Sequence, residues 1–579
     1  MTQRYFAALV LLLAWLPAAA FAQTISSFSP ASGNAGTLVT LRGTDLNLVT
    51  AVAVNGTSCV ILDKTNSTLH LLVMPAATSG PVTTTGGAPA ASATAFAVTR
   101  PAVNPAQQGA KLVGTAAVGR ANQGWSMALS ADGNTMAVGG PYDKGGAGFT
   151  TGATWVFARS GSAWSQQGPK LVGTGTFSGH MYQGTHIALS ADGNTLAVGG
   201  SISDGTGATW VFTRSGSAWS QQGPNLVGAG AESNRTQGYA VALSADGNTL
   251  AMGEFYDGNR GDGATWVFTR SGTAWSQQGP KLVGTGAVGQ ARQGWSVALS
   301  ADGNTLAVGG LEDNGTGATW VFVRGATLWS QQGPKLVGTG AVGPYVTTQG
   351  WAVALSADGN TLAVGGPNDH AGSTTGATWV FTRSGSAWSQ QGPKLVGTGA
   401  VGIATFQGHT VALSADGNTL AIGGYSDNST VGATWLFTRS GTAWSQQGPK
   451  LVGAGAGGAA HQGSAVALSA DGNTLAVGGL FDNNGIGAAW VFSMSGTSLA
   501  QQAAVGPRAR GSFFPNPVSE QLTVTGGASR GTLRLYDSTG QLLRSTTYLE
   551  GQPLNLSALP AGLYWLMLDQ APAQPLLKR

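Results

Sequence analysis

The sequence predicts an all-β protein whose central part is a seven-bladed β-propeller, with a smaller β-domain on either side. The motif Ala-Asp-Gly-Asn-Thr occurs seven times at intervals of 54 to 60 residues, which indicates an array of repeated units. Glycine makes up 92 of the 579 residues, about twice its usual share of roughly 7%, and marks many tight turns. No stretch shows a sustained helical period. The motif aspartates are Asp132, Asp192, Asp246, Asp302, Asp358, Asp416 and Asp471.

Each repeat has the pattern of four short antiparallel strands. In the unit 295–338, strand-like runs occur at Ser296–Leu299, Thr305–Val308, Ala318–Val323 and Leu328–Val337. Asp-Gly and Gly-Asn at 302–304 favour a tight hairpin turn, because both steps tolerate positive φ. Seven such units fit a β-propeller, whose radial blades leave only short sheet edges. A β-solenoid is the alternative, although its repeats are usually shorter.

Tryptophan repeats in step with the motif. Thirteen of the 18 tryptophans occupy two repeated positions, which indicates a packing role. In one series the tryptophan is the last residue of Gly-Ala-Thr-Trp or Gly-Ala-Ala-Trp; its members are Trp155, Trp210, Trp266, Trp320, Trp379, Trp435 and Trp490. The other begins Trp-Ser-Gln-Gln, at Trp164, Trp219, Trp275, Trp329, Trp388 and Trp444.

Two segments compete to complete the ring. Gln107–Gly114 matches the fourth strand of a unit although it precedes the first complete repeat, and the degenerate segment Leu499–Gly506 follows the last one. One of the two should close the seventh blade. If the N-terminal segment does so, deletion of residues 103–114 should abolish cooperative unfolding.

Residues 1–22 have the pattern of a secretory signal peptide. Arg4 precedes the apolar run Phe6–Leu16, and Ala-Phe-Ala at 20–22 forms a cleavage site. The run is shorter than the ~20 residues that span a bilayer, so we expect cleavage, and no transmembrane segment in the mature chain. The single cysteine, Cys59, cannot form an internal disulfide, and its apolar neighbours favour a buried, inert thiol over a reactive one.

Charge argues against two classes of partner. Only 9% of the residues are charged and the net charge is +4, which is too small and too dispersed for a nucleic-acid or anionic-membrane footprint. We therefore expect no nucleic-acid partner.

Residues 107–506, within a predicted propeller domain of residues 101–506, resemble the FG-GAP repeats of integrin-type propellers. Units such as Trp-Ser-Gln-Gln-Gly-Pro-Lys-Leu-Val-Gly followed by Val-Ala-Leu-Ser-Ala-Asp-Gly-Asn-Thr carry the resemblance. The resemblance implies a propeller fold and, in the family, calcium loops with several closely spaced Asp or Asn oxygens.

Each motif loop has one aspartate and one asparagine, whereas Ca²⁺ needs six to eight ligands. This departure favours turn formation over calcium binding, and we expect no metal and no cofactor, with calcium as the open alternative. A second ring of aspartates also suggests structural turns: Asp143, Asp204, Asp257, Asp313, Asp369, Asp427 and Asp482.

One face of the predicted propeller carries most of the sequence variation. Its loops connect the second and third strands and adjacent blades, and loops that vary over a fixed scaffold often form binding surfaces; relaxed constraint after duplication is the alternative. The residue after each repeated Gln-Gly belongs to this face. An aromatic ring there could stack on sugars or anchor a protein, or it could fill the crevice between blades. The predicted ligand-binding residues are Trp125, Tyr239, Trp295, Trp351 and His409, and the same position holds Thr185 and Ser464.

Catalytic patterns are sparse. Glu254 and Glu312 are a conceivable pair for glycoside hydrolysis, because we expect them in corresponding loops of adjacent blades. His180 and His186 lack a usual zinc spacing. No phosphate loop and no Ser-His-Asp motif is present. We therefore expect a protein without enzymatic activity.

Residues 23–100 resemble the IPT/TIG family, which implies an Ig-like β-sandwich. The segments Ile25–Gly33 (ISSFSPASG) and Gly36–Gly43 (GTLVTLRG) carry the resemblance. Such domains are spacers or adhesive modules in secreted proteins, and we favour a spacer.

After a linker at residues 507–512, residues 513–579 are similar to the C-terminal sorting domain of the type IX secretion system. Phe-Pro-Asn-Pro at 514–517, Leu-Pro-Ala-Gly-Leu-Tyr at 559–564 and the terminal Lys578 and Arg579 carry the similarity. It implies a β-sandwich, recognition by the secretion machinery of a Gram-negative cell after Sec export, and attachment to surface lipopolysaccharide or release. An ordinary terminal β-sandwich is the alternative.

Together these observations predict a secreted or surface-displayed, non-enzymatic adhesion protein. We expect its variable loop face to bind a glycan or a cell-surface protein. A structural surface-layer scaffold and a polysaccharide-active enzyme are the alternatives.

Overall fold

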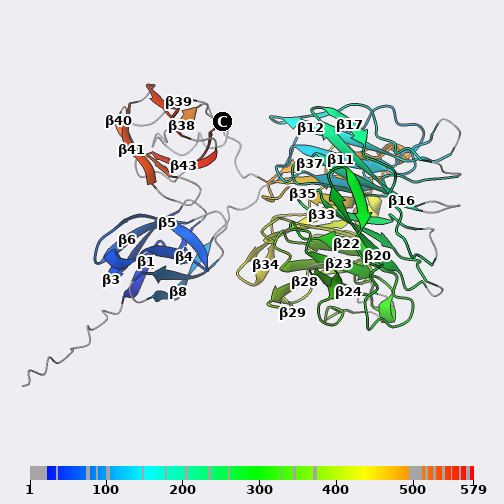
Figure 1. Ribbon diagram of the computed structural model, residues 1–579, viewed down its shortest axis with the longest axis horizontal. Coiled ribbons are helices and arrows are strands. Elements are labelled where there is room, and N and C mark those ends of the chain that lie inside the picture. Colours follow the sequence, from blue (N-terminus) through cyan, green and yellow to red (C-terminus); the bar gives the residue numbers. More distant parts are fainter. Residues whose placement is uncertain are drawn as a thin grey trace, which may run out of the picture. The chain divides into compact units, whose positions relative to one another are not determined.

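The computed structural model describes most of the chain between residues 23 and 578 (Figure 1). Residues 102–503 form one compact unit, and the N-terminal and C-terminal regions each have a hydrophobic core of their own. The predicted signal peptide, Leu499–Gly506 and most of the linker lie outside the described residues. The segments not described within this span are 34–36, 74–78, 87–88, 99–104, 146–148, 176–178, 202–206, 233–235, 259–260, 326–327, 343–346, 370–373, 495–511, 515–519, 526–529, 537–541, 550, 560–561 and 569–573.

The central unit is a seven-bladed propeller, as predicted. Each blade is an antiparallel four-stranded sheet, and the first strands of neighbouring blades contact one another all the way around the axis. Blades 1 to 3 are β10 (Ser126–Leu129), β11 (Thr135–Gly140), β12 (Ala153–Ser160) and β13 (Ala163–Gln166); β14 (His186–Leu189), β15 (Thr195–Gly200), β16 (Ala208–Ser215) and β17 (Ala218–Gln221); and β18 (Ala240–Leu243), β19 (Thr249–Glu254), β20 (Ala264–Ser271) and β21 (Ala274–Gln277).

The remaining blades follow the same order. Blade 5 adds a strand that pairs in parallel with its third strand, and blade 7 takes its last strand from the beginning of the propeller. Blades 4 to 7 are β22 (Gln293–Leu299), β23 (Thr305–Gly310), β24 (Ala318–Arg324) and β25 (Trp329–Gln331); β26 (Ala352–Leu355), β27 (Thr361–Gly366), β28 (Thr374–Ser384) and β29 (Ala387–Gln390), with β30 (Ala404–Gln407); β31 (Thr410–Leu413), β32 (Thr419–Gly424), β33 (Ala433–Ser440) and β34 (Ala443–Gln446); and β35 (Gln462–Leu468), β36 (Thr474–Gly479), β37 (Ala488–Ser493) and β9 (Ala106–Gln107). Short helical turns η2 (Asp313–Gly315), α1 (Asp427–Thr430) and α2 (Asp482–Gly485) follow the second strands of blades 4, 6 and 7.

The fourth strand is shorter than the sequence predicts. In blade 4 the predicted run 328–337 contains only the strand β25. Gly333, with φ +71°, and Pro334 turn the chain away from β24, because proline has no N–H to donate to a ladder. Leu336 then returns to form a single bridge with Thr319.

The N-terminal segment closes the ring. Strand β9 pairs with β37, Gln108 N donates to Val491 O at 2.8 Å, and Leu112 forms a bridge with Ala489. The strand also makes the side-chain contact of a regular fourth strand. Gln107 Oε1 accepts a hydrogen bond from Ala454 N at 2.7 Å, and the equivalent glutamines of other blades accept the same bond. The first of the two competing segments therefore completes blade 7.

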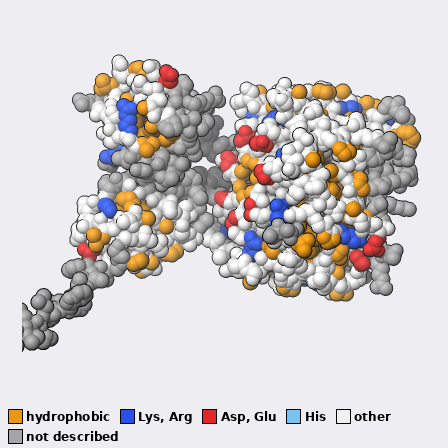
Figure 2. Space-filling view, viewed as in Figure 1, with side chains coloured by type: hydrophobic (Ala, Val, Ile, Leu, Met, Phe, Trp, Pro, Cys, Tyr) orange, Lys and Arg blue, Asp and Glu red, His pale blue; other side chains and the backbone are white. Residues whose placement is uncertain are grey.

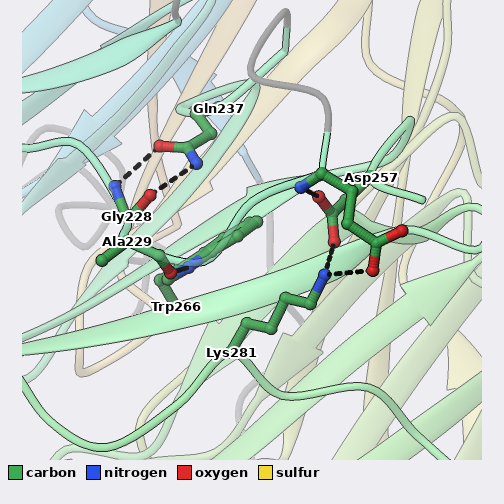
Figure 3. Close-up of polar contacts among 7 residues, drawn as sticks. Gly228, Ala229, Gln237, Asp257, Trp266 and Lys281 are labelled. Atoms are coloured by element: carbon green, nitrogen blue, oxygen red, sulfur yellow. Dashed lines mark hydrogen bonds and ion pairs between the residues drawn. The ribbon is translucent and has the colours of Figure 1, made fainter.

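The repeated Gly-Ala-Thr-Trp tryptophans form the cores between blades. Trp266 is fully buried and its Nε1 donates to Ala229 O at 2.8 Å (Figure 3). Gly228 lies flat on the indole, where an added Cβ would be 2.4 Å from Trp266 Cδ1. The Gln237 side chain fixes that glycine by two hydrogen bonds. Gly228 N donates to Gln237 Oε1 at 2.7 Å, and Gln237 Nε2 donates to Gly228 O at 3.0 Å. This arrangement recurs in all seven blades.

The Ala-Asp-Gly-Asn turns are self-contained. Asp302 Oδ1 accepts Ser300 Oγ at 2.5 Å and Asn304 N at 3.0 Å, and its Oδ2 accepts Asn304 Nδ2 at 2.9 Å. Burial raises the pKa of Asp302, but these hydrogen bonds and the charge of Arg324 outweigh it, so that the pKa is lowered overall. The carboxylate oxygens are thus engaged within their own turn, as the prediction of turn formation requires.

A ring of seven backbone hydrogen bonds joins these turns around the axis. The alanine N–H of each turn donates to the alanine carbonyl of the next, at 2.8 to 2.9 Å, and the last, from Ala470 to Ala131, links blade 7 to blade 1. This explains why the Ser-Ala-Asp-Gly-Asn loops vary so little. On the propeller face visible in Figure 2, acidic and basic side chains are few, and uncharged side chains and backbone cover most of the described surface.

The second ring of aspartates has a different structural role from the predicted turns. Asp257 is buried; its Oδ1 accepts Glu232 N at 2.6 Å and its Oδ2 pairs with Lys281 Nζ at 2.5 Å (Figure 3). Lys281 also contacts Glu232 Oε1 at 3.1 Å. The equivalent pairs are Asp143–Lys170, Asp313–Lys335, Asp369–Lys394, Asp427–Lys450 and Asp482–Lys111. Asp204 lies outside the described residues, and blade 2 has Asn225 in place of the lysine.

We expect Lys335→Met to destabilise the protein by about 3 kcal/mol, because it leaves the fully buried Asp313 carboxylate without its cation. Urea denaturation of the full chain would measure the change. Lys144→Met is the control, because Lys144 is exposed and forms no ion pair with a described residue, and it should change stability by less than about 0.5 kcal/mol. Equal stability of the two variants would contradict a structural role for the pairs.

The N-terminal domain is an eight-stranded arrangement in the order β1-β3-β6-β5-β4-β7-β8-β2. Its core contains Leu41, Leu71 and Phe96, and Cys59 is partly buried against that core. The elements are β1 (Thr24–Ser29), β2 (Ser32–Gly33), β3 (Leu38–Thr44), η1 (Leu46–Leu48), β4 (Ala51–Val54), β5 (Thr57–Lys64), β6 (Thr68–Leu72), β7 (Gly80–Thr85) and β8 (Ala90–Val98).

The C-terminal domain has two sheets that share one core, including Val524, Leu535 and Leu566. The first sheet is β38 (Ser512–Phe514), β39 (Gln521–Thr525) and β42 (Pro553–Asn555), and the second is β41 (Leu542–Leu549), β40 (Arg530–Tyr536), β43 (Gly562–Leu568) and β44 (Gln574–Lys578). Among the described residues, no helix is long and apolar enough to cross a membrane.

Candidate functional site

A cavity of about 1020 Å³ opens on the propeller axis at the face that carries the variable loops. All seven first strands contribute to it, so it belongs to the whole ring. This volume is at the upper end of the range for small-molecule sites, roughly 300–1,000 Å³. Its apolar wall is a ring of one residue from each blade: Met127, Ile187, Val241, Val297, Val353, Val411 and Val466.

The structure brings all five predicted ligand-binding residues to this cavity. Four of them form a continuous run of ring contacts, with centroid separations of 4.8 Å from Tyr239 to Trp295, 4.9 Å from Trp295 to Trp351, and 5.5 Å from Trp351 to His409. Trp125 lies on the blade 1 side of the same cavity. We call these five residues the collar. Whether the collar binds a ligand stays a prediction.

The other two blades have small residues at the collar position. Thr185 is buried and its Oγ1 donates to Tyr182 O at 2.6 Å. Ser464 lines the cavity, but its Oγ lies within hydrogen-bond distance of Gly124 O and Gly478 O. Neither hydroxyl is therefore available as a ligand donor without giving up an internal bond.

The collar tryptophans differ from the thirteen repeated ones. Every repeated indole N–H donates to a protein acceptor: the first series to a backbone carbonyl and the second series to a glutamine Oε1. The indole N–H groups of Trp125, Trp295 and Trp351 donate to no described residue, and these side chains stay partly exposed. The crevices between blades are filled by the buried series, such as Trp320. The three collar tryptophans therefore present exposed ring surface and indole N–H donors that are not used in contacts with other described residues.

Sequence reasoning missed several aromatic residues that extend the collar. Tyr142, Tyr425 and Phe481 come from the loops after the second strands, one or two residues after the repeated Gly-Gly. Tyr142 contacts Trp125 at 5.6 Å and Tyr425 contacts His409 at 4.6 Å between ring centroids. Aligning the one or two residues that follow each Gly-Gly would have found them.

His186 and His409 are in the wall of the cavity, and burial lowers the pKa of each to about 4. For His409, the nearby His186 and His461 lower the pKa further, while a hydrogen bond at the Ser464 backbone opposes the shift. Both imidazoles are thus held neutral. His180 is not among the described residues that line the cavity, and its Nδ1 accepts a hydrogen bond from Thr150 N at 2.9 Å.

These shifts predict a pH dependence of stability. An unfolded histidine titrates near pH 6.5, so the unfolded state binds more protons between about pH 4 and 6.5 and the folded state loses stability as the pH falls through that window. The slope is at most about 1.4 kcal/mol per pH unit for each histidine. We expect the His186→Gln, His409→Gln variant to lose less stability than the parent between pH 7 and pH 4.5 in urea titrations. Identical losses in both proteins would contradict the assignment.

The cavity mouth carries positive charge on one side. Arg120 and Lys144, both exposed and both from blade 1, are among its lining residues. No Asp or Glu is among the described residues that line it. Of the two kinds of variable loop that the sequence places on this face, the one before the first strand of blade 1 contributes Arg120, and the one after its second strand contributes Lys144.

The carboxylate pair considered for glycoside hydrolysis does not form at this cavity. Glu254 is the last residue of β19 and corresponds to Gly310 in β23, whereas Glu312 lies two residues beyond that strand, so the two do not occupy corresponding positions. Glu254 is buried and Glu312 pairs with Arg292 at 2.7 Å. Neither is among the lining residues. In the described part of the chain, no group of three or more His, Cys, Asp or Glu residues could hold a metal ion.

Comparison with known families matches the two terminal domains. Residues 24–89 match the IPT/TIG domain, and residues 512–575 match the secretion system C-terminal sorting domain. The chain carries a type IX secretion sorting domain. That domain indicates export to the cell surface or the extracellular space, which confirms the predicted location and the involvement of the type IX secretion machinery.

The search of curated proteins found no significant match. Solved structures similar to the chain include an auxiliary nutrient binding protein from Bacteroides thetaiotaomicron (10% identity, 82% of this chain and 98% of that chain, TM-score 0.34). Others are the periplasmic gluconolactonase PpgL of Pseudomonas aeruginosa (18%, 57% and 85%, 0.39) and the Cps50 (Swd1) β-propeller domain of Myceliophteria thermophila (13%, 66% and 99%, 0.39). At these scores they carry no argument about function. The resemblance of the repeats to FG-GAP units stays a prediction.

Proposed function

We propose that the propeller is the binding module of this exported protein and that its axial cavity binds a glycan, for adhesion and without catalysis. The observation that carries the proposal is the set of three collar tryptophans whose indole N–H groups have no described acceptor. Sugars present C–H faces that stack on aromatic rings and hydroxyl oxygens that accept from N–H donors. The collar offers both kinds of contact side by side.

The volume of the cavity supports a glycan end or a short branch as the occupant. About 1020 Å³ can accommodate more than one sugar ring. The apolar wall consists of five valines, one isoleucine and one methionine, whose side chains offer apolar contact to a bound sugar and no acid or base. The sorting domain is in keeping with such a role, because an adhesin must be displayed outside the cell or released there.

A scaffold without a ligand is the main alternative. A scaffold needs the thirteen bonded tryptophans, the seven alanine hydrogen bonds and the Asp–Lys pairs, and these features are present in nearly every blade. It has no need of a different, partly exposed aromatic residue in only some blades, as at Trp295 and Trp351. This contrast favours a binder over a scaffold.

Depletion from solution tests the proposal. The full mature chain is incubated with insoluble polysaccharides and with cell surfaces, beside a Trp295→Ala, Trp351→Ala variant. We expect saturable depletion by at least one glycan surface and its loss in the variant, with an unchanged melting temperature as the control for folding. Failure of every surface to deplete the parent would overturn the glycan proposal and favour a scaffold or a protein partner.

A further inference from the structure

The charges around the cavity mouth point to the class of glycan, an inference that rests on the proposed function. The described lining residues include two cations, Arg120 and Lys144, and no carboxylate. A neutral sugar would gain little binding energy from this excess of positive charge. A ligand with an acidic group would be attracted and oriented by it.

The acidic residues of the neighbouring loops are already engaged. Asp143 pairs with Lys170, Asp482 pairs with Lys111, and Glu312 pairs with Arg292. Arg120 and Lys144 form no ion pair with any described residue. The local excess of positive charge is therefore not neutralised by the loops that carry it.

The two cations come from the same blade as an aromatic pair that lines the cavity. Arg120 comes shortly before β10 and Lys144 follows β11, so that both flank Trp125 and Tyr142, whose ring centroids are 5.6 Å apart. The Lys144 stem lies along Gly119, where an added Cβ would be 3.4 Å from Lys144 Cδ. The Lys144 stem therefore packs beside the backbone that leads directly into Arg120.

We propose that the ligand is an acidic saccharide whose anionic group, a carboxylate or a sulfate, binds to Arg120 and Lys144. The sugar ring that carries this group stacks on Trp125 and Tyr142, while the rest of the glycan follows the collar toward Trp295. Arginine can bind either group through two parallel hydrogen bonds, and the lysine adds a point charge. Because both side chains are exposed, this part of the affinity is sensitive to salt.

Three soluble polysaccharides separate the possibilities: polygalacturonate carries carboxylates, dextran sulfate carries sulfates, and dextran is the neutral parent of dextran sulfate. Binding of the full mature chain is compared with that of Arg120→Gln, Lys144→Gln. The control Arg42→Gln, Arg534→Gln removes the same net charge from the terminal domains. We expect the parent and the control to bind at least one acidic polymer about tenfold or more tightly than neutral dextran, with the preference falling as salt is raised, and the Arg120→Gln, Lys144→Gln variant to lose the preference.

Each outcome has a separate meaning. Preference for polygalacturonate or for dextran sulfate supports the inference and identifies the anionic group. Equal binding of acidic and neutral polymers, or an acidic preference that the Arg120→Gln, Lys144→Gln variant retains, overturns the inference while leaving the proposed glycan binding intact. Binding of none of these polymers by a parent that glycan surfaces deplete overturns the acidic-saccharide class, whereas failure of those surfaces as well overturns the proposed function itself.

Discussion

A chain without residues 103–114 should lose the single cooperative melting transition of the propeller. The deletion removes β9, so β37 of blade 7 has no outer partner. It also removes Lys111, which leaves the buried Asp482 without its cation, and Gly114, which packs on Trp155. Because the first strands form a closed ring, opening one blade loosens its contacts with both neighbours. We expect a broad, low-amplitude transition in near-ultraviolet circular dichroism.

Deletion of residues 499–506 is the matched control for this experiment. That segment is the other candidate for closure in the sequence, whereas blade 7 takes its fourth strand from β9. The control should melt like the parent. A 103–114 deletion that also melts like the parent would contradict closure by the N-terminal strand.

Replacing the two central collar tryptophans should weaken glycan binding in steps. Trp295→Phe, Trp351→Phe keeps two stacking rings but removes both indole donors, each worth about 1 kcal/mol as a net hydrogen bond, so affinity should fall about thirtyfold. Trp295→Ala, Trp351→Ala also removes the stacking, worth about another 1 kcal/mol per ring, and the fall should approach a thousandfold. Isothermal titration with the glycan found by depletion would measure both.

The repeated tryptophans supply the contrast for the collar. Trp388→Phe removes the indole N–H that donates to Gln332 Oε1 at 2.9 Å. Trp388 lies on β29, the fourth strand of blade 5, whereas the cavity is lined by the first strands. It should lower the melting temperature and leave the affinity of the folded protein unchanged. Equal affinities for the parent and the Trp295→Phe, Trp351→Phe variant would show that the free donors are not used.

The sequence predicts the propeller because the same motifs recur once in every blade, so that each blade can be recognised independently of the others. The Asp-Gly-Asn turn and Gly-Ala-Thr-Trp strand define each sheet, and the match of Gln107–Gly114 to a fourth strand anticipates closure. The collar residues are also predictable, since Trp295 and its equivalents vary at a fixed place in a constant frame. Such inferences need only the period and the alignment of the repeats.

Other features depend on contacts between distant residues. The pairing of Asp257 with Lys281 joins two loops of one blade, and both residues read as ordinary repeat positions in the sequence. The early end of β25 follows from Gly333 and Pro334 leaving the ladder, which an apolar run does not reveal. The missed residue Tyr425 is an exception, because it directly follows the repeated Gly-Gly and an alignment of the repeats would have identified it.

Protection of tryptophans from oxidation by a bound glycan is the sharpest test of binding in the axial cavity. The full mature chain is treated with a mild indole oxidant, with and without saturating glycan, and each tryptophan is quantified by mass spectrometry. We expect the ligand to protect Trp125, Trp295 and Trp351 and to leave the reactivity of the thirteen repeated tryptophans unchanged. Unchanged oxidation of the three collar residues in the presence of a bound glycan would contradict binding in the axial cavity.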